Sequence, residues 1–220
     1  MFQPIEQSHP LFVLNQTKIC AVSRGHAREE IIPIAEALFR GGVKVIEITL
    51  NTPQALAMIF DMRSHFQDRM IIGAGTVRTP FEADEAFRAG AQFLVTPHTD
   101  VKIIERATTH QQPIINGAMT PTEIWTAWQA GATAIKLFPV KSNWETYLQE
   151  LQGPFPEIPF VVMGGINASN LSKALSLGVL GVGIGGELFP KEAIQSKEYH
   201  AIEKAAKHLI KAHQHYVKHK

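Results

Sequence analysis

The stretch Gly131-Ala-Thr-Ala-Ile-Lys136-Leu-Phe-Pro139 places a lysine inside an apolar run of strand length. A glycine precedes the run and a proline ends it, which predicts a strand over residues 132–138 that is buried on both faces of a parallel sheet. Burying an ammonium group is costly unless it is paired or loses its proton. A neutral lysine is a nucleophile towards ketones, so Lys136 is a candidate catalytic residue. The alternative is that it reaches out of the strand end into water or forms a simple ion pair.

A second stretch, Gly42-Val-Lys-Val-Ile-Glu47-Ile-Thr-Leu50, has the same layout. Its glutamate lies five positions after a glycine, as Lys136 lies five positions after Gly131. If the two runs are equivalent strands of one parallel sheet, Glu47 and Lys136 emerge at the same end and on the same face. A plain salt bridge between the two side chains is the main alternative to a joint catalytic role.

The rest of the chain repeats a strand-then-helix unit. Three helix starts are marked by Thr-Pro pairs at Thr52-Pro53, Thr79-Pro80 and Thr120-Pro121, and the last two are capping boxes completed by Glu82 and Glu123. Eight units recur at a spacing of about 20–26 residues. This predicts an α/β protein with a (β/α)8 barrel, one domain over residues 1–220, preceded by a short helix at residues 3–14 and closed by a helix at residues 197–213.

An open, doubly wound sheet is the competing α/β architecture. The segment Gly181-Val-Gly-Ile-Gly-Gly186 has the spacing of a dinucleotide-binding fingerprint. Pro190 follows soon after it, and too little chain remains for a second βαβ unit. A glycine-rich turn after the last barrel strand explains the segment better.

Composition excludes several classes of function. The 220 residues are 45% hydrophobic and carry a formal net charge of +1, which argues against electrostatic binding of nucleic acid or an acidic membrane surface. The first residues, Met1-Phe-Gln-Pro-Ile-Glu-Gln, lack the basic start and long apolar core that are typical of a signal peptide, and no run approaches membrane-spanning length. We therefore expect a cytoplasmic protein without membrane contact.

Metal and disulfide chemistry have little support. Cys20 is the single cysteine and lies in an apolar run, which predicts a buried side chain rather than a disulfide or metal ligand. A set of histidines near the C-terminus, His200, His208, His213, His215 and His219, lies among lysines and is expected to form a solvated tail rather than a metal site.

In a barrel, the functional groups follow the carboxyl ends of the strands. The residues in those places are Arg24, Glu47, Thr76, Pro97, Lys136, Phe138, Gly164, Gly165, Gly185 and Gly186. They combine an amine that can form an imine, a carboxylate that can move protons, a guanidinium and a hydroxyl that can hold a carboxylate, and two glycine pairs that can hold an anion. Each has a plainer alternative, such as turn formation for the glycines and packing for Phe138 and Pro97.

The residues resemble the class I aldolases that act on 2-keto-3-deoxy-6-phosphogluconate (KDPG), 2-keto-4-hydroxyglutarate (KHG) and 2-keto-3-deoxy-6-phosphogalactonate. The likeness spans nearly the whole chain and rests on Val-Ile-Glu47-Ile-Thr-Leu, Gly73-Ala-Gly-Thr76-Val, Gly90-Ala-Gln-Phe-Leu-Val-Thr-Pro97, Ile135-Lys136-Leu-Phe-Pro139, Gly153-Pro-Phe-Pro156 and Gly164-Gly-Ile-Asn. It implies a trimeric barrel without metal or cofactor, with Lys136 as the Schiff-base lysine and Glu47 as the general acid and base.

This chain departs from the family pattern at four positions. Gluconate-type members often have arginine where it has Asn51, and many relatives have serine at Gly186, threonine at Met163 and proline at Asn116. Ser23-Arg24-Gly25 and the segment around Asn51 look more like the galactonate type. The missing serine hydroxyl weakens the case for a phosphate on the substrate.

The resulting hypothesis is a retro-aldol cleavage of a keto acid to pyruvate and an aldehyde, with Arg24 and Thr76 holding the substrate carboxylate and Phe138 and Pro97 shaping the pocket. One rival is a phosphosugar epimerase or isomerase in which Lys136 only stabilises an enolate. A second rival is a barrel that binds small anions without catalysis.

Overall fold

Eight parallel strands close into a barrel in chain order, each paired with its neighbours and β8 paired with β1. The computed structural model describes residues 6, 9–140 and 142–218, with side chains up to residue 213. The strands are β1 (Ile19–Ser23), β2 (Val45–Thr49), β3 (Ile71–Gly75), β4 (Leu94–Val95), β5 (Ile114–Ala118), β6 (Ala134–Leu137), β7 (Phe160–Met163) and β8 (Gly181–Ile184). The predicted (β/α)8 barrel is therefore confirmed, and the doubly wound sheet is excluded.

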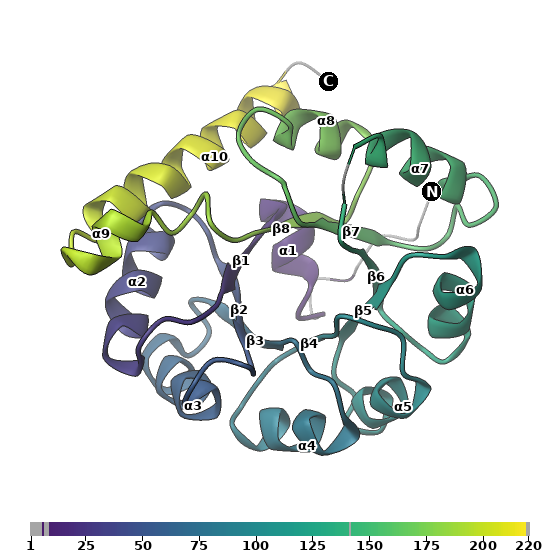
Figure 1. The fold of residues 1–220 in the computed structure, drawn as a ribbon, viewed down its shortest axis with the longest axis horizontal. Coiled ribbons are helices and arrows are strands. Elements are labelled where there is room, and N and C mark those ends of the chain that lie inside the picture. The colour runs from purple at the N-terminus through teal and green to yellow at the C-terminus, as the bar shows by residue number, and fades with distance from the viewer. Residues whose placement is uncertain (1–5, 7–8, 141, 219–220) are drawn as a thin grey trace.

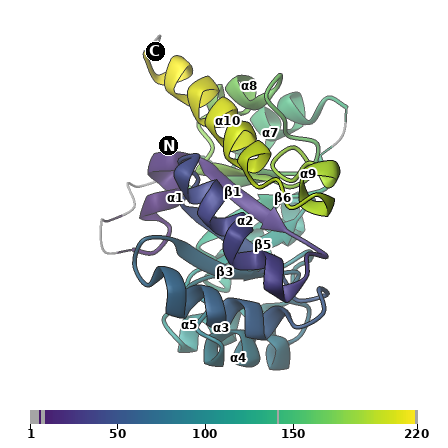
Figure 2. The same ribbon diagram turned by 90° about the vertical axis from the view of Figure 1, so that its left-hand side faces the viewer.

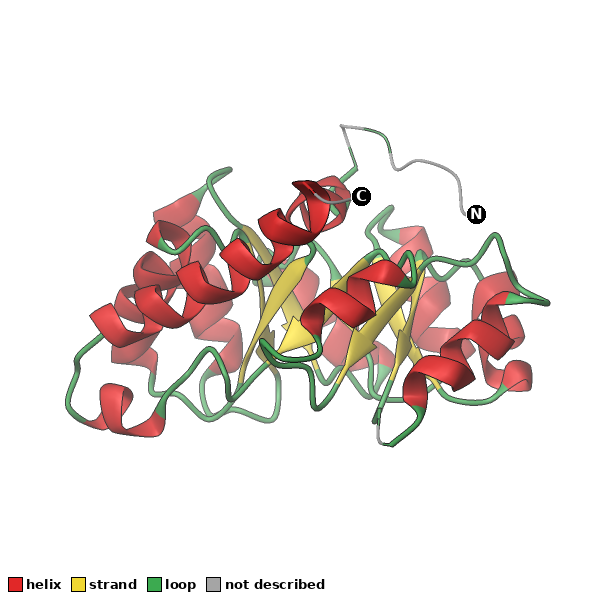
Figure 3. Cartoon of the chain, turned by 90° about the horizontal axis from the view of Figure 1, so that it is seen from above, coloured by secondary structure: helices red, strands yellow, loops and turns green. Residues whose placement is uncertain are grey.

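Helices surround the strands on the outside of the barrel (Figures 1 and 3). They are α2 (Arg28–Arg40), α3 (Ala55–Phe66), α4 (Pro80–Arg88), α5 (Val101–Thr109), α6 (Pro121–Gln129), α7 (Trp144–Gln152), α8 (Leu171–Ser176), α9 (Lys191–Gln195) and α10 (His200–Lys218). One further helix, α1 (Phe12–Thr17), lies across the barrel opening in Figure 1. This order gives each strand a return path over the outer face of the sheet.

Two of the three predicted Thr-Pro helix starts are confirmed. The Thr79 and Thr120 hydroxyls accept hydrogen bonds from the backbone N–H of Glu82 and Glu123, as N-caps do. The third is wrong, because α3 begins at Ala55 and its N-cap is Gln54. The Thr52 hydroxyl instead accepts from the Gly25 N–H at 2.9 Å and shares a 3.0 Å hydrogen bond with Thr49. It therefore ties the loop after β1 to the end of β2.

The core divides into two hydrophobic clusters. One fills the layer between the strands and the outer helices, and the other lies inside the barrel. The inner cluster contains Cys20, Val45, Phe93 and Ala134, which confirms that Cys20 is a buried apolar contact. Alternation along each strand separates the two clusters, since successive side chains point to opposite faces.

The leading helix was predicted at residues 3–14, but α1 begins at Phe12 and ends at Thr17. Pro10 disfavours a helical conformation at the residue before it, so the helix starts beyond the proline. Residues 3–5 and 7–8 lie outside the described residues. Leu11 and Leu14 are fully buried in the inner cluster, and Leu14 packs so close to Gly181 that a Cβ there would lie 2.8 Å from it. The segment thus plugs the amino end of the barrel.

The glycine-rich segment of β8 is an interior strand rather than a dinucleotide-binding turn. A Cβ at Gly181 would meet Leu14, and a Cβ at Gly183 would lie 2.6 Å from the Met163 side chain. The glycines recur every second residue because this strand faces bulky neighbours inside the barrel.

The closing helix is divided. Instead of one helix over residues 197–213, α9 ends at Gln195 and α10 begins at His200, with Lys197 at φ 59° between them. α10 runs alongside α2 and α8 (Figures 1 and 2). Among the described residues there is no group of His, Cys, Asp or Glu able to hold a metal; the side chain of His215 and all of His219 lie outside them. No described helix is long and apolar enough to cross a membrane.

Candidate active site

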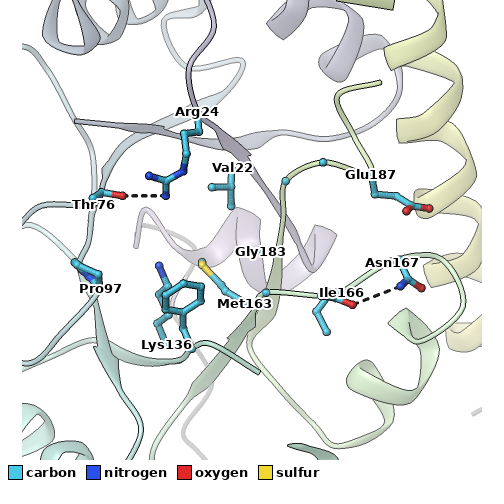
Figure 4. A pocket seen from close by; sticks show the side chains of 15 residues that line it. Val22, Arg24, Thr76, Pro97, Lys136, Met163, Ile166, Asn167, Gly183 and Glu187 are labelled. Carbon is cyan, nitrogen blue, oxygen red and sulfur yellow. Dashed lines mark hydrogen bonds between the residues drawn. The ribbon is translucent and has the colours of Figure 1, made fainter. Parts of the chain in front are cut away.

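A cavity of about 740 Å³ opens at the carboxyl ends of the strands. All the residues predicted for the site line it except Glu47: Arg24, Thr76, Pro97, Lys136, Phe138, Gly164, Gly165, Gly185 and Gly186. Figure 4 shows Arg24, Thr76, Pro97 and Lys136 on one side of the cavity and Asn167 and Glu187 on the other. The strand ends therefore gather these side chains as the barrel prediction required.

Lys136 lies inside the barrel near the end of β6, with 5% of its surface exposed. Its Nζ lies 4.5 Å from the centre of the Phe138 ring. Burial lowers the pKa of Lys136 below its ordinary value; the Glu47 carboxylate opposes this shift and the Arg24 guanidinium adds to it. A larger fraction of this amine is neutral at a given pH than of a lysine in water.

Glu47 lies in the middle of β2 and is 1% exposed. A Cβ at Gly75 would lie 2.7 Å from Oε1 of Glu47, so the glycine makes room for the carboxyl group. Burial raises the pKa of Glu47, while Lys136 and Arg24 pull it down. Its Oε2 is buried without a hydrogen-bond partner among the described residues. An unpartnered buried carboxyl oxygen is costly in a purely structural residue and is typical of a functional one.

Glu47 and Lys136 influence each other electrostatically but form no salt bridge in the described part of the chain. The plain salt bridge considered from the sequence is therefore not what the structure contains. Burial is the largest cause of both shifts, and it raises the pKa of Glu47 and lowers the pKa of Lys136. An amine and a carboxyl group whose pKa values are shifted towards neutral pH can each gain or lose a proton readily near pH 7. Both groups can therefore exchange protons with a bound molecule.

Arg24 is held between two neighbouring loops. Its Nη1 donates to Oδ1 of Asn51 at 2.8 Å. Its Nη2 donates to the Thr76 hydroxyl at 3.2 Å (Figure 4). Thr76 follows β3 with φ 55°, a left-handed conformation that is uncommon for threonine and is found at functional sites. The arrangement directs a guanidinium and a hydroxyl to one side of the cavity, where together they suit a carboxylate.

The glycine pair after β7 forms a turn with both residues in the left-handed region, Gly164 at φ 95° and Gly165 at φ 70°. The carbonyl of Gly165 accepts from the side-chain amides of Asn167 at 3.4 Å and Asn170 at 2.9 Å. The backbone N–H groups of Gly164, Gly165 and Gly186 donate no hydrogen bond in the described structure. Free N–H groups on a tight turn are suited to an anion.

Pro97 is positioned by a buried polar network behind the barrel wall. The Thr96 hydroxyl donates to the carbonyl of His98 at 2.8 Å and accepts from the Gly117 N–H at 2.9 Å. Asn116 is fully buried, and its Oδ1 lies 3.2 Å from the same hydroxyl. This network fixes the turn that brings Pro97 to the cavity. The asparagine at position 116 is therefore a partner of Thr96.

Sequence reasoning missed several lining residues: Val22, Met163, Ile166, Asn167, Gly183 and Glu187. Alternation gives a signal for Val22, since Cys20 on the same strand also faces the barrel interior. Glu187 directly follows the predicted residue Gly186, but no local sequence pattern indicates that the loop after β8 brings Glu187 to the cavity wall. Met163 is one of the positions at which the chain departs from the family pattern, and Ile166 and Asn167 end the Gly164-Gly-Ile-Asn motif, but neither fact predicts that these side chains line the cavity.

The comparisons agree with this geometry. The family model described as KDPG and KHG aldolase matches residues 12–205. The 2-dehydro-3-deoxy-6-phosphogalactonate aldolase of Escherichia coli (strain K12) is 34% identical over 201 residues, which cover 90% of this chain and 96% of that protein. The KHG/KDPG aldolase of the same organism is 35% identical over 184 residues, covering 83% and 85%.

A solved structure is similar over the same region. The KDPG aldolase from Legionella pneumophila, with pyruvate captured at low pH as a covalent carbinolamine intermediate, has a TM-score of 0.85 and 30% identity, and the match covers 93% of this chain and 99% of that one. The barrel, the buried lysine and the sequence relatives agree, and the chain belongs to the KDPG and KHG aldolase family of class I carbon–carbon lyases.

Proposed function

We propose that this aldolase cleaves a 2-keto-3-deoxy-6-phospho-sugar acid of the gluconate or galactonate type, or 2-keto-4-hydroxyglutarate, to pyruvate and an aldehyde. The observation that carries the proposal is Lys136, a buried amine with a lowered pKa that lines an open cavity beside a buried carboxyl group. The galactonate type is the first to test, because that relative is matched over 96% of its length.

Lys136 is the nucleophile in this proposal. Its neutral Nζ attacks the C2 ketone, and loss of water gives an iminium ion. The iminium accepts the electron pair of the C3–C4 bond as that bond breaks, which releases the aldehyde and leaves an enamine. Protonation at C3 and hydrolysis then free pyruvate and restore the amine. Phe138, whose ring faces Nζ, shapes the pocket around this reaction together with Pro97.

Glu47 moves the protons. As a carboxylate it accepts the proton of the 4-hydroxyl group while the C3–C4 bond breaks, and as an acid it returns a proton to C3 of the enamine. Its unpartnered Oε2 and its raised pKa support this role, because the group gains and loses a proton more readily near neutral pH than a solvated glutamate does. Glu47 lies beneath the cavity wall rather than on it, so a bridging water molecule is part of the proposal.

The two ends of the substrate are held by different groups. Arg24 and Thr76 bind the carboxylate at C1, supported by the hydrogen bond from Arg24 to Asn51. The glycine pairs at residues 164–165 and 185–186 bind the distal anionic group through their backbone N–H groups, which compensates for the absence of a serine hydroxyl at Gly186.

Borohydride reduction with pyruvate tests the proposal directly. An imine on Lys136 is reduced to a stable adduct that mass spectrometry locates on the peptide containing this residue. Lys136→Met should remove the adduct, whereas Lys102→Met, which replaces an exposed lysine on α5, should keep it. An enzyme that uses Lys136 only to stabilise an enolate would give no adduct. Pyruvate release from the gluconate, galactonate and hydroxyglutarate substrates, measured side by side, identifies the substrate.

We further propose that residues 1–220 form one domain, that the protein works in the cytoplasm, and that it assembles as a homotrimer. α1 and α10 both pack on the barrel, which supports one domain. The family resemblance implies the trimer, and the exposed aromatic residues Phe60 (60% exposed) and Phe81 (68% exposed) offer apolar surface for subunit contacts. Analytical ultracentrifugation measures the assembly, and a monomer at micromolar concentration would contradict the trimer.

A further inference from the structure

Thr52 lies in the loop after β2, yet its hydroxyl is buried and binds another loop. The residue is only 4% exposed. Its hydroxyl accepts a hydrogen bond at 2.9 Å from the N–H of Gly25, which lies 27 positions earlier in the loop after β1. Buried hydroxyl groups need hydrogen-bond partners, and this one finds its partner far away in the sequence. The Thr52 side chain therefore serves the loop after β1 rather than the start of α3.

Thr49 anchors Thr52 to the strand that carries Glu47. Thr49 is the last residue of β2 and is fully buried, and its hydroxyl lies 3.0 Å from that of Thr52. The backbone strengthens this contact, because the Thr52 N–H donates to the Thr49 carbonyl at 2.9 Å. Thr49 and Glu47 are two positions apart, so they share one face of the strand. The hydrogen bonds that lead to Gly25 therefore begin on the strand of the proton carrier.

Gly25 is held by a hydrogen bond rather than by packing. Its φ is 74°, in the left-handed region that glycine adopts without strain. A Cβ built there would meet no described atom within 4 Å outside the two chain neighbours of Gly25. The Gly25 N–H donates to the Thr52 hydroxyl. Because glycine has the greatest backbone freedom of any residue, loss of this hydrogen bond would loosen the loop directly beside Arg24.

Arg24 is thereby held at both ends by the segment that follows β2. Its backbone is joined to Gly25, which Thr52 binds, and its guanidinium donates to Asn51 at 2.8 Å. The Arg24 side chain is exposed. A long, exposed side chain loses conformational freedom when it binds a ligand, and contacts that fix it beforehand reduce this loss. The two contacts therefore prepare the arginine for its ligand.

We propose that Thr52 is a positioning residue that holds Arg24 where its guanidinium meets the C1 carboxylate of the keto acid, and that Thr49 anchors it. The inference rests on the proposed function, since it takes Arg24 as the ligand of that carboxylate. Thr52 does not line the active-site cavity in the described structure, so it acts through Arg24. Because β2 also carries Glu47, one strand sets the places of the carboxylate ligand and of the proton carrier.

Thr52→Val tests this role, because valine has the shape of threonine without the hydroxyl. The Gly25 N–H loses its acceptor, so KM should rise about 3–10-fold, the effect of one hydrogen bond, while kcat changes by less than about twofold. Thr52→Ser keeps a hydroxyl and should restore the KM of the wild type. The rise should be the same for the gluconate, galactonate and hydroxyglutarate substrates, because all three share the C1 end.

Thr133→Val is the matched control. The Thr133 hydroxyl accepts from the Ile114 N–H at 3.1 Å, the same kind of hydrogen bond, but at the amino ends of β5 and β6. Urea denaturation should show a lower free energy of unfolding for both valine variants, and only Thr52→Val should raise KM. An unchanged KM in Thr52→Val, or an equal rise in both variants, would show that the Thr52 hydroxyl has a structural role only.

A double-mutant cycle with Arg24→Ala tests whether Thr52 acts through the arginine. The cycle measures the pyruvate concentration that gives half-maximal borohydride trapping on Lys136, since pyruvate carries the C1 carboxylate. Thr52→Val should raise this concentration about 3–10-fold when Arg24 is present and by less than about twofold in the Arg24→Ala background. Equal factors in both backgrounds would overturn the inference, because Thr52 would then act independently of Arg24.

The outcomes separate this inference from the proposed function. Cleavage by the wild type with an unchanged KM in Thr52→Val overturns the positioning role alone. Cleavage with an unchanged KM in Arg24→Ala overturns the carboxylate assignment and the positioning role, and leaves the reaction in place. A wild type that releases pyruvate from none of the three substrates and forms no adduct on Lys136 overturns the proposed function and the inference together.

Discussion

The two ends of the barrel interior differ in chemistry although the same eight strands form both. At the amino end, Leu11 and Leu14 close the barrel against Cys20 and Phe93, and all four side chains are fully buried. At the carboxyl end, two ionisable side chains are buried beneath an open cavity. One end is packed as a hydrophobic core, and the other keeps groups that such a core would exclude.

The difference shows how the fold accommodates its site. Burying Glu47 and Lys136 destabilises the folded state, by several kcal/mol for each group that is left charged and unpaired. Burying an aliphatic side chain stabilises it by about 1.5–3 kcal/mol, so the apolar plug offsets part of that cost. The amino end should therefore determine stability, and the carboxyl end should determine activity.

The largest effect is expected at Glu47. Glu47→Gln removes the proton carrier while keeping the shape of the side chain, so kcat should fall about 10²–10⁴-fold. The imine with pyruvate should still be trapped by borohydride, because Lys136 is intact. Steady-state kinetics and mass spectrometry measure the two. Glu105→Gln, on an exposed face of α5, is the matched control and should behave as the wild type.

Leu14→Ala tests the opposite end. The change leaves a cavity in the apolar plug and should lower the free energy of unfolding by about 2–5 kcal/mol. Val13→Ala on the same helix should cost less, because Val13 is only half-buried. Urea denaturation measures both. The kcat of folded Leu14→Ala should equal that of the wild type, and a large loss of kcat at full folding would show that the two ends are not separable.

Thr76→Ala should affect substrate binding more than the chemical step. It removes the hydroxyl that accepts from Arg24 and that we assign to the C1 carboxylate, so KM should rise about tenfold, as expected for one hydrogen bond to a charged group. Asn51→Ala should raise KM less, because Asn51 supports Arg24 from outside the cavity wall. Thr122→Ala, on an exposed part of α6, is the control. Equal KM values in all three variants would contradict the assignment of the carboxylate.

The smallest effect is a pH dependence of stability. The folded-state pKa of Glu47 is raised, so the folded protein retains a proton that the unfolded chain has lost. This contribution to stability is fully present below about pH 4.5, the ordinary pKa of glutamate, and it is lost as pH rises through the raised value. Glu47→Gln has no such loss. The unfolding free energy of the variant minus that of the wild type should therefore increase as pH rises from about 4.5 towards 7, and a constant difference would show that Glu47 is not desolvated.

Local patterns account for most of what the sequence predicted correctly. The eight strands and the caps at Thr79 and Thr120 follow from short-range rules, and so does the arrangement that gathers Lys136 with Arg24 and Thr76 at one rim. One of the errors arose where a side chain is used by a distant segment. Thr52 has a capping sequence, yet its hydroxyl bonds to Gly25 in another loop, and α3 begins later.

By itself, the sequence determined the repeating strand-then-helix unit and the placement of Glu47 and Lys136 at equivalent strand positions, because alternation and turn residues act over a few positions. Only the tertiary structure decided that the two groups are buried without a salt bridge in the described part of the chain and that Asn51 holds Arg24. Those features depend on the closing of β8 onto β1 and on distances between segments far apart in the chain. Electrostatic effects follow distance and burial, which no local pattern contains.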